Sequence, residues 1–224
     1  MIKAVVFDLD NTVYNYDQCH KKAMAKLKTV CMKKFAISSD VFDENFEQAK
    51  KIVKNRLGNT GSSHNRLLYM QKFLELIGER PAVYALDLYD VYWDTMLDKM
   101  MTYSYVIPLF NELKKNRIKI AILTDLTAHI QHRKLKKLGI AEYIDVLVTS
   151  EEAGMEKPDL KMFKLVQEKL YVKSEELLMV GDSKKKDIEG AESAGMKGIL
   201  FDENMEQEIL KLCMEMIKGE TEGE

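Results

Sequence analysis

The chain has 224 residues, of which 46% are hydrophobic, and its 34 basic and 36 acidic side chains leave a net charge of −2. This apolar content supports a substantial buried core, and the balanced charge excludes a chain-wide field that would attract nucleic acid or an anionic membrane. No apolar run approaches the roughly 20 residues that span a bilayer, and the three cysteines are spaced for neither disulfides nor a metal site. We therefore expect a cytoplasmic, globular monomer or homodimer.

The first predicted strand is an apolar run at residues 3–9, and the next clear strand does not begin until residue 118. Helical periodicity dominates the sequence between them, with possible N-caps at Ser38 and Ser39 and a proline, Pro81, suited to a first helical turn. Four helices are predicted there, at 19–35, 38–57, 66–78 and 82–101.

From residue 104 onward, predicted strands and helices alternate. The strands lie at 118–124, 145–150, 177–182 and 198–201, and the helices at 106–116, 128–138, 159–170 and 186–194. Short apolar strands separated by amphipathic helices predict an α/β fold with a Rossmann-like parallel sheet. We expect this core domain to comprise residues 1–14 and 104–224, with a helical domain inserted at 15–103, and the charged run after residue 217 to fray.

Polar side chains follow the predicted strands of the core. Ligands bind beyond the carboxyl ends of the strands in an open parallel sheet, so side chains at those ends are expected to meet. They are Asp8 and Asp10 after the first strand, Thr124 after the second, Lys157 in the loop after the third, and Asp182 and Asp187 after the fourth.

Four carboxylates in one place would repel one another unless they share a cation. Hard oxygen ligands with open water positions suit Mg²⁺, which is therefore the predicted metal. Together with Lys157 and the Thr124 hydroxyl, the metal would form a positive cavity for a dianionic phosphoryl group. One of the carboxylates is then in a position to attack phosphorus.

Four motifs in this order resemble those of the haloacid dehalogenase superfamily. They are "DLDNT" at 8–12, "ILTD" at 122–125, "KP" at 157–158 and "GDSKKKD" at 181–187, so the resemblance covers the whole chain. It implies a hydrolase of phosphoric monoesters with a helical cap of the type inserted after the first strand. The cap would close over the site and exclude water until the substrate is bound.

The resemblance also implies roles for individual residues. Asp8 would be the nucleophile that forms an aspartyl-phosphate, and Asp10 the acid and then the base. Thr124 and Lys157 would hold the phosphoryl oxygens.

The resemblance further implies a set of metal ligands. Asp182 would bind Mg²⁺ together with a carboxylate oxygen of Asp8 and the backbone carbonyl of Asp10. Asp187 would orient metal-bound water or Lys157. Because dehalogenases lack an acid at the position of Asp10, a phosphoryl substrate is favoured over a haloacid.

Three other residues are candidates for contact with the substrate. Tyr14 either lines the mouth of the pocket or packs in the hinge, and Arg66 either reads the leaving group or begins a solvated helix. Asp125 and Leu126 replace the Asn and Gly of many relatives. The Asp125 carboxylate is expected to point away, so that only its amide serves the phosphate, with substrate selection as the alternative.

These residues favour a Mg²⁺-dependent phosphatase acting on a small metabolite, either a sugar phosphate or a nucleoside monophosphate. Transfer of the phosphoryl group to another hydroxyl, as in the phosphoglucomutase relatives, is the alternative. A phosphorylatable signalling module is a third reading, since receiver domains also gather Asp, Thr and Lys at strand ends. Asp10 and the large insert argue against that module, because a receiver needs neither.

Overall fold

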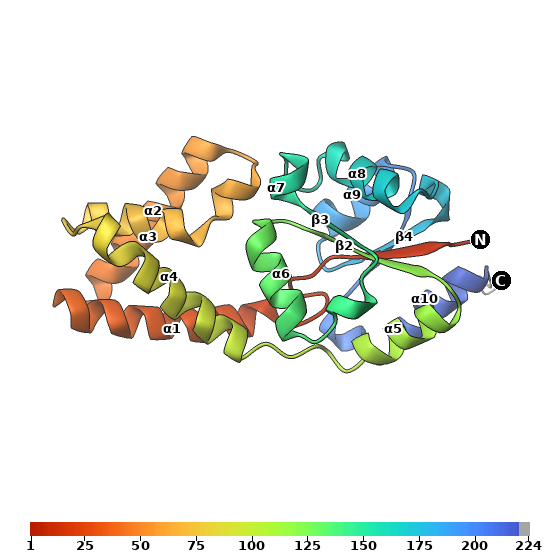
Figure 1. Ribbon diagram of the computed structural model, residues 1–224, viewed down its shortest axis with the longest axis horizontal. Coiled ribbons are helices and arrows are strands. Elements are labelled where there is room, and N and C mark those ends of the chain that lie inside the picture. Colours follow the sequence, from red (N-terminus) through yellow and green to blue (C-terminus); the bar gives the residue numbers. More distant parts are fainter. Residues whose placement is uncertain (220–224) are drawn as a thin grey trace. The chain divides into compact units, whose positions relative to one another are not determined.

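The computed structural model describes residues 1–219 and resolves the chain into two compact units (Figure 1). The first, which we call the sheet unit, contains residues 1–15 and the chain from Met101 onward. The second, the helical unit, contains residues 16–100. The charged run in which fraying is expected lies, from residue 220 onward, outside the described residues.

The sheet unit is built on five parallel strands in the order β3-β2-β1-β4-β5. The strands are β1 (Ala4–Phe7), β2 (Lys119–Thr124), β3 (Val146–Thr149), β4 (Leu177–Gly181) and β5 (Lys197–Leu200). The predicted α/β, Rossmann-like class is confirmed. Because β1 is central, the residues that follow it lie between the ends of β2 and β4.

Helices precede or connect strands β2 to β5, and one further helix follows β5. They are α5 (Val106–Lys115), α6 (Ala128–Lys137), α7 (Ser150–Ala153), α8 (Leu160–Leu170), α9 (Glu189–Ser193) and α10 (Ile209–Lys218). The sequence analysis did not predict α10, although its buried residues Ile209, Cys213 and Ile217 recur every four positions, as on one face of a helix. In Figure 1, α8 and α9 lie on one side of the sheet, and α5 and α10 on the other.

Alternate residues of each strand face opposite helical layers. On one face, Val6, Leu123 and Met179 form a fully buried cluster with the α8 residues Phe163 and Val166. On the other face, Phe7 packs against Phe110 of α5, with ring centroids 5.1 Å apart. With both faces covered, the polar side chains that follow the strands gather at the carboxyl edge of the sheet.

The helical unit consists of the four predicted helices. They are α1 (Tyr16–Phe35), α2 (Ser39–Leu57), α3 (Arg66–Leu76) and α4 (Pro81–Asp98). The Ser38 hydroxyl accepts a hydrogen bond from the Val41 amide as the N-cap of α2, and Pro81 begins α4. The core of the helical unit includes the aromatic rings of Phe42, Phe46 and Phe73, whose centroids are 5.2 to 5.8 Å apart. Among residues 1–219, no helix is both long and apolar enough to cross a membrane.

Gly190 allows α9 to approach α8, so Gly190→Ala tests how tightly this side of the sheet is packed. A Cβ at this position would lie 2.6 Å from the Phe163 ring and 3.1 Å from Pro158. Alanine favours helix more than glycine does, by about 1 kcal/mol. We nevertheless expect a net destabilisation of about 1 to 3 kcal/mol from overpacking, measured by urea denaturation. The control is Glu192→Ala on the exposed side of α9, for which no loss is expected; a stabilised Gly190→Ala protein would contradict the packing argument.

Candidate active site

The ends of β1, β2 and β4 bring the predicted site residues together. Phe7 is in register with Ile122 of β2 and Val180 of β4, and the Asp8 amide continues the ladder by donating to the Val180 carbonyl over 2.9 Å. Asp8 therefore lies between Thr124, the last residue of β2, and Asp182, the first residue after β4. The apolar strands position these polar groups.

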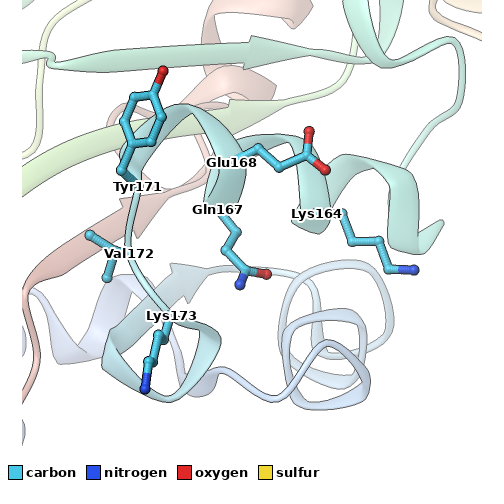
Figure 2. Close-up of a pocket in the computed structure, with 6 residues that line it drawn as sticks. All are labelled: Lys164, Gln167, Glu168, Tyr171, Val172 and Lys173. Carbon is cyan, nitrogen blue, oxygen red and sulfur yellow. The ribbon is translucent and has the colours of Figure 1, made fainter.

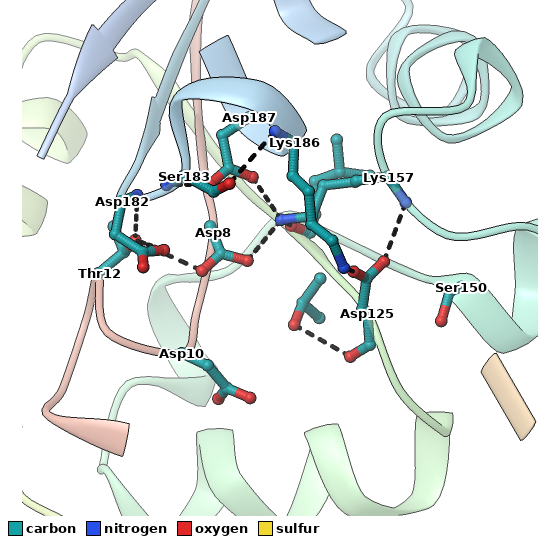
Figure 3. Close-up of polar contacts among 12 residues, drawn as sticks. Asp8, Asp10, Thr12, Asp125, Ser150, Lys157, Asp182, Ser183, Lys186 and Asp187 are labelled. Atoms are coloured by element: carbon teal, nitrogen blue, oxygen red, sulfur yellow. Dashed lines mark hydrogen bonds and ion pairs between the residues drawn. The ribbon is translucent and has the colours of Figure 1, made fainter. Parts of the chain in front are cut away.

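The Lys157 side chain lies at the centre of the site. Its ammonium donates to an oxygen of Asp8 at 2.5 Å, to one of Asp187 at 2.6 Å and to the Leu123 carbonyl at 3.0 Å (Figure 3). Only 3% of the side chain is exposed. Burial by itself would lower the pKa of Lys157, but the charges of Asp187 and Asp8 outweigh it and hold that pKa above the ordinary value. Lys157 is therefore a firmly charged cation.

Asp187 reaches Lys157 because the preceding strand ends in glycine. A Cβ on Gly181 would lie 2.4 Å from the carboxyl carbon of Asp187, so no larger residue fits there without moving that carboxylate. A π-helical turn over Lys184–Ile188 carries Asp187, whose second oxygen accepts from the Ser183 amide at 3.0 Å. Asp187 thus holds the Lys157 ammonium together with Asp8 (Figure 3), and the orienting role expected of it stays a prediction.

Three of the carboxylates form a cluster that could hold a cation. One oxygen from each of Asp8, Asp182 and Asp187 lies within 4.8 Å of the others. Burial raises the pKa of Asp8 to about 8 in the absence of a metal; Lys157 opposes the rise, and Asp187 and Asp10 add to it. Loss of solvent around its carboxylate and the charge of Asp187 raise the pKa of Asp182 to about 6. A bound cation would relieve both, so this set of hard oxygen donors fits a divalent metal.

Thr12 joins the loop after β1 to the loop after β4. Its hydroxyl accepts a hydrogen bond from the Asp182 amide at 3.0 Å and lies 3.4 Å from carboxylate oxygens of Asp8 and Asp182. The side chain is fully buried. The motif "DLDNT" contains this threonine, but the sequence alone gave it no task.

The Asp10 carboxylate points away from the other three (Figure 3). Both of its oxygens accept from the Lys134 ammonium, at 2.7 and 2.8 Å, and one also accepts from the Tyr14 hydroxyl at 2.7 Å. Lys134 is completely buried. The metal role expected of Asp10 concerns its backbone carbonyl and stays a prediction.

Lys134 was missed in the sequence analysis, although a signal was present. It lies four residues after Ile130 and four before Leu138, at an inward position of the amphipathic α6. A lysine there needs a buried partner. Tyr14, predicted to line the pocket mouth or to pack in the hinge, donates directly to the Asp10 carboxylate.

Asp125 is tied into the site by its carboxylate. One oxygen accepts from the Lys157 amide at 3.0 Å and the other pairs with Lys186 at 2.8 Å. Its charge is thereby neutralised by protein groups, and the role of its own amide toward phosphate stays a prediction. Leu126, at the glycine position of many relatives, has a φ of 96°, a value that glycine adopts far more readily than leucine. The loop thus keeps a left-handed conformation despite the substitution.

The Thr124 hydroxyl accepts from the Gln131 amide at 2.7 Å and lies 3.2 Å from the Asp125 carbonyl, to which it can donate. Gln131 is fully buried on α6 and was not predicted as a site residue. Arg66 belongs to the helical unit, where it contacts Tyr16 and the His64 carbonyl. Its expected contact with substrate therefore stays a prediction.

Comparisons with known proteins identify the family and the fold. The sequence profile of the haloacid dehalogenase-like hydrolases matches residues 2–195. A ribulose-1,5-bisphosphate 5-phosphatase of Halopiger xanaduensis is 38% identical, covering 93% of this chain and 88% of that protein. A glyceraldehyde 3-phosphate phosphatase of Methanopyrus kandleri is 34% identical, covering 88% and 82%. The crystal structure of a HAD phosphatase from Thermococcus onnurineus aligns with a TM-score of 0.66 at 27% identity, covering 91% and 87%.

The burial of Lys134 leads to a stability prediction. Asp10→Asn removes its anionic partner and leaves a buried, uncompensated ammonium. We expect a loss of about 2 to 3 kcal/mol, below the range for a fully buried pair because the Asp10 side chain is 29% exposed. In the double variant Asp10→Asn/Lys134→Met the unpaired charge is gone, and most of the loss should be recovered. Urea denaturation measures both.

The control is Asp43→Asn, which breaks the exposed pair with Lys28 and should cost less than about 1 kcal/mol. Equal losses in Asp10→Asn and the double variant would show that the Lys134 ammonium is not the source of the cost.

Proposed function

We propose that this chain, which belongs to the haloacid dehalogenase-like hydrolase family and is a hydrolase of phosphoric monoesters, dephosphorylates a small sugar phosphate through an aspartyl-phosphate on Asp8. The observation that carries the proposal is the buried Asp8 carboxylate, held by the Lys157 ammonium and clustered with Asp182 and Asp187. In this arrangement Asp8 supplies a nucleophile, and Lys157 supplies a cation for a dianionic phosphoryl group. Of the two substrate classes that the sequence favours, the named activities of the relatives support the sugar phosphates.

We propose Mg²⁺ as the metal. Asp8 and Asp182 would hold it through carboxylate oxygens and Asp10 through its backbone carbonyl, while Asp187 would act on Lys157 or on a water of the metal. The raised pKa values of Asp8 and Asp182 support this, because a metal-free cluster favours protonation and a protonated carboxyl is a poor nucleophile. When bound, the ion would neutralise phosphoryl charge and orient the group for in-line attack.

In the first step, a carboxylate oxygen of Asp8 attacks phosphorus. The bond between phosphorus and the leaving oxygen breaks, and that oxygen takes a proton from Asp10, which must be protonated by water before this step because it is the anionic partner of Lys134 in this structure. Lys157 and Thr124 would bind the phosphoryl oxygens, for which Lys157 exchanges one of its three acceptors and the Thr124 hydroxyl exchanges the Asp125 carbonyl. Asp10 is paired with Lys134 and Tyr14 in this structure, so it must exchange at least one of these partners for the leaving group.

In the second step, Asp10, now a carboxylate, removes a proton from water. The water oxygen attacks phosphorus, and the bond from phosphorus to Asp8 breaks. Inorganic phosphate leaves, and both carboxyl groups return to their starting states. Hydrolysis therefore requires Asp10 twice, first as acid and then as base.

The proposal is tested by replacing the nucleophile. Asp8→Asn should lower kcat for ribulose 1,5-bisphosphate, glyceraldehyde 3-phosphate and 4-nitrophenyl phosphate at least about 1,000-fold in the presence of Mg²⁺, because the attacking oxygen is lost. Released inorganic phosphate is the measurement.

Lys161→Gln, on the exposed surface of α8, is the control and should keep wild-type turnover. If Asp8→Asn kept most of the activity, a mechanism through an aspartyl-phosphate on Asp8 would be contradicted. Turnover that needs a bisphosphate activator and releases little phosphate would identify a mutase instead.

Metal removal gives a separate prediction. Treatment with EDTA should abolish phosphate release, and added Mg²⁺ should restore it, because the clustered carboxylates need a shared cation. Asp182→Asn should weaken Mg²⁺ binding at least about 10-fold, seen as a smaller Mg²⁺-dependent rise of Tm and a higher Mg²⁺ concentration for half-maximal activity. Full activity in EDTA, with no effect of Mg²⁺ on Tm, would rule out the proposed metal site.

A further inference from the structure

We propose that Gln131 of α6 is a positioning residue for phosphoryl binding, because its side-chain amide leaves the proton of the Thr124 hydroxyl available to a phosphoryl oxygen. The inference rests on the proposed function, in which Thr124 binds the phosphoryl group, and adds the residue that sets the role of this hydroxyl. Gln131, Thr124 and Asp125 all belong to the sheet unit, so the inference needs nothing from the helical unit.

The Thr124 hydroxyl can serve a phosphoryl group only as a donor. Phosphoryl oxygens accept hydrogen bonds, whereas a threonine hydroxyl has one proton to give and two lone pairs to receive. Thr124 is the last residue of β2, and its hydroxyl lies 3.2 Å from the Asp125 carbonyl, which competes for that single proton. Whether the proton is available to phosphate therefore depends on what else donates to the Asp125 carbonyl.

The Gln131 side chain donates to both oxygens. Its Nε2 lies 2.7 Å from the Thr124 hydroxyl oxygen and 2.5 Å from the Asp125 carbonyl oxygen. A carbonyl oxygen can only accept, so the Gln131 atom beside it is the amide nitrogen, whose two protons are directed one to each oxygen. The hydroxyl thus receives a hydrogen bond from Gln131, and the carbonyl has a donor without the hydroxyl. The Thr124 proton is thereby freed for a ligand.

The start of α6 accounts for this position of the Gln131 side chain. The helix begins at Ala128, and the Gln131 backbone amide donates to the Thr127 carbonyl at 3.2 Å in the first turn. Helical side chains lean toward the N-terminus of their helix, so Gln131 reaches back to the residues that end β2. The side chain is fully buried, which excludes water as a competitor for its amide.

Stability does not explain an amide at this position. The Gln131 Oε1 atom is buried, and within residues 1–219 it has no hydrogen-bond partner. A buried carbonyl oxygen without a donor costs stability. If Gln131 were apolar, the Thr124 hydroxyl would donate to the Asp125 carbonyl, and neither oxygen would lose its last partner. The effect of the amide on Thr124 is a reason for its presence that packing does not supply.

The test replaces Gln131 by methionine, which has a similar length but no amide. KM and the Ki for inorganic phosphate should both rise about 3- to 10-fold with little change in kcat, because the phosphoryl group loses a charged hydrogen bond before and during the reaction. The rise should be equal for glyceraldehyde 3-phosphate and 4-nitrophenyl phosphate, since the leaving group is not involved. Tm should stay within about 2 °C of the wild type, which a merely structural role would not allow. Gln131→Leu should give the same result.

Gln167→Met is the matched control. Gln167 lies in the wall of a hollow at the end of α8 (Figure 2), where its side chain accepts from the Ser174 hydroxyl at 3.0 Å. The same chemical change at this position should leave KM and the Ki for phosphate unchanged, because Gln167 contacts no group of the candidate site.

A double-mutant cycle shows whether Gln131 acts through the hydroxyl. Calorimetry of inorganic phosphate binding to the Asp8→Asn protein in Mg²⁺ measures affinity apart from turnover. In a Thr124→Val background, which lacks the hydroxyl, Gln131→Met should weaken binding by less than about 2-fold. In a Thr124→Ser background, which keeps the hydroxyl, it should weaken binding about 3- to 10-fold, as it does with threonine.

Equal effects of Gln131→Met with and without the hydroxyl, or an unchanged affinity for phosphate, would overturn the inference while the proposed function stands. A wild type that binds phosphate but releases none from the esters would overturn the proposed function, and the cycle would still decide the role of Gln131. Absence of phosphate binding would overturn both.

Discussion

The Lys157 ammonium, buried between the carboxylates of Asp8 and Asp187, is the interaction on which the site depends. A buried cation is stable only with such partners, and these carboxylates would repel each other without it. The arrangement requires that residue 181 be a glycine, because the Asp187 carboxylate occupies the space that a Cβ on residue 181 would fill. One ion-pair network therefore constrains the end of β4, the turn that follows it and the loop that carries Lys157.

A second buried lysine, Lys134, gives Asp10 an environment different from that of Asp8. The two residues are separated by one position, yet Asp8 belongs to the carboxylate cluster, whereas Asp10 is held by Lys134 and Tyr14. The two neighbouring carboxylates therefore have different partners, and such a difference is what the proposed division into nucleophile and acid needs. Lys134 also links Asp10 to α6, the helix whose Gln131 donates to the Thr124 hydroxyl.

The sequence by itself determined the parallel sheet, the helical insertion and the positions of Asp8, Thr124, Lys157 and Asp182 at or beyond the carboxyl ends of the strands. Each follows from local periodicity, and parallel strands bring their carboxyl ends to one edge whatever the details of packing. Tertiary structure alone decided which charges meet. The pairing of Asp10 with Lys134 joins residues 124 positions apart, and that of Asp125 with Lys186 joins residues 61 positions apart. Such contacts depend on how helices pack, and no short stretch of sequence encodes that geometry.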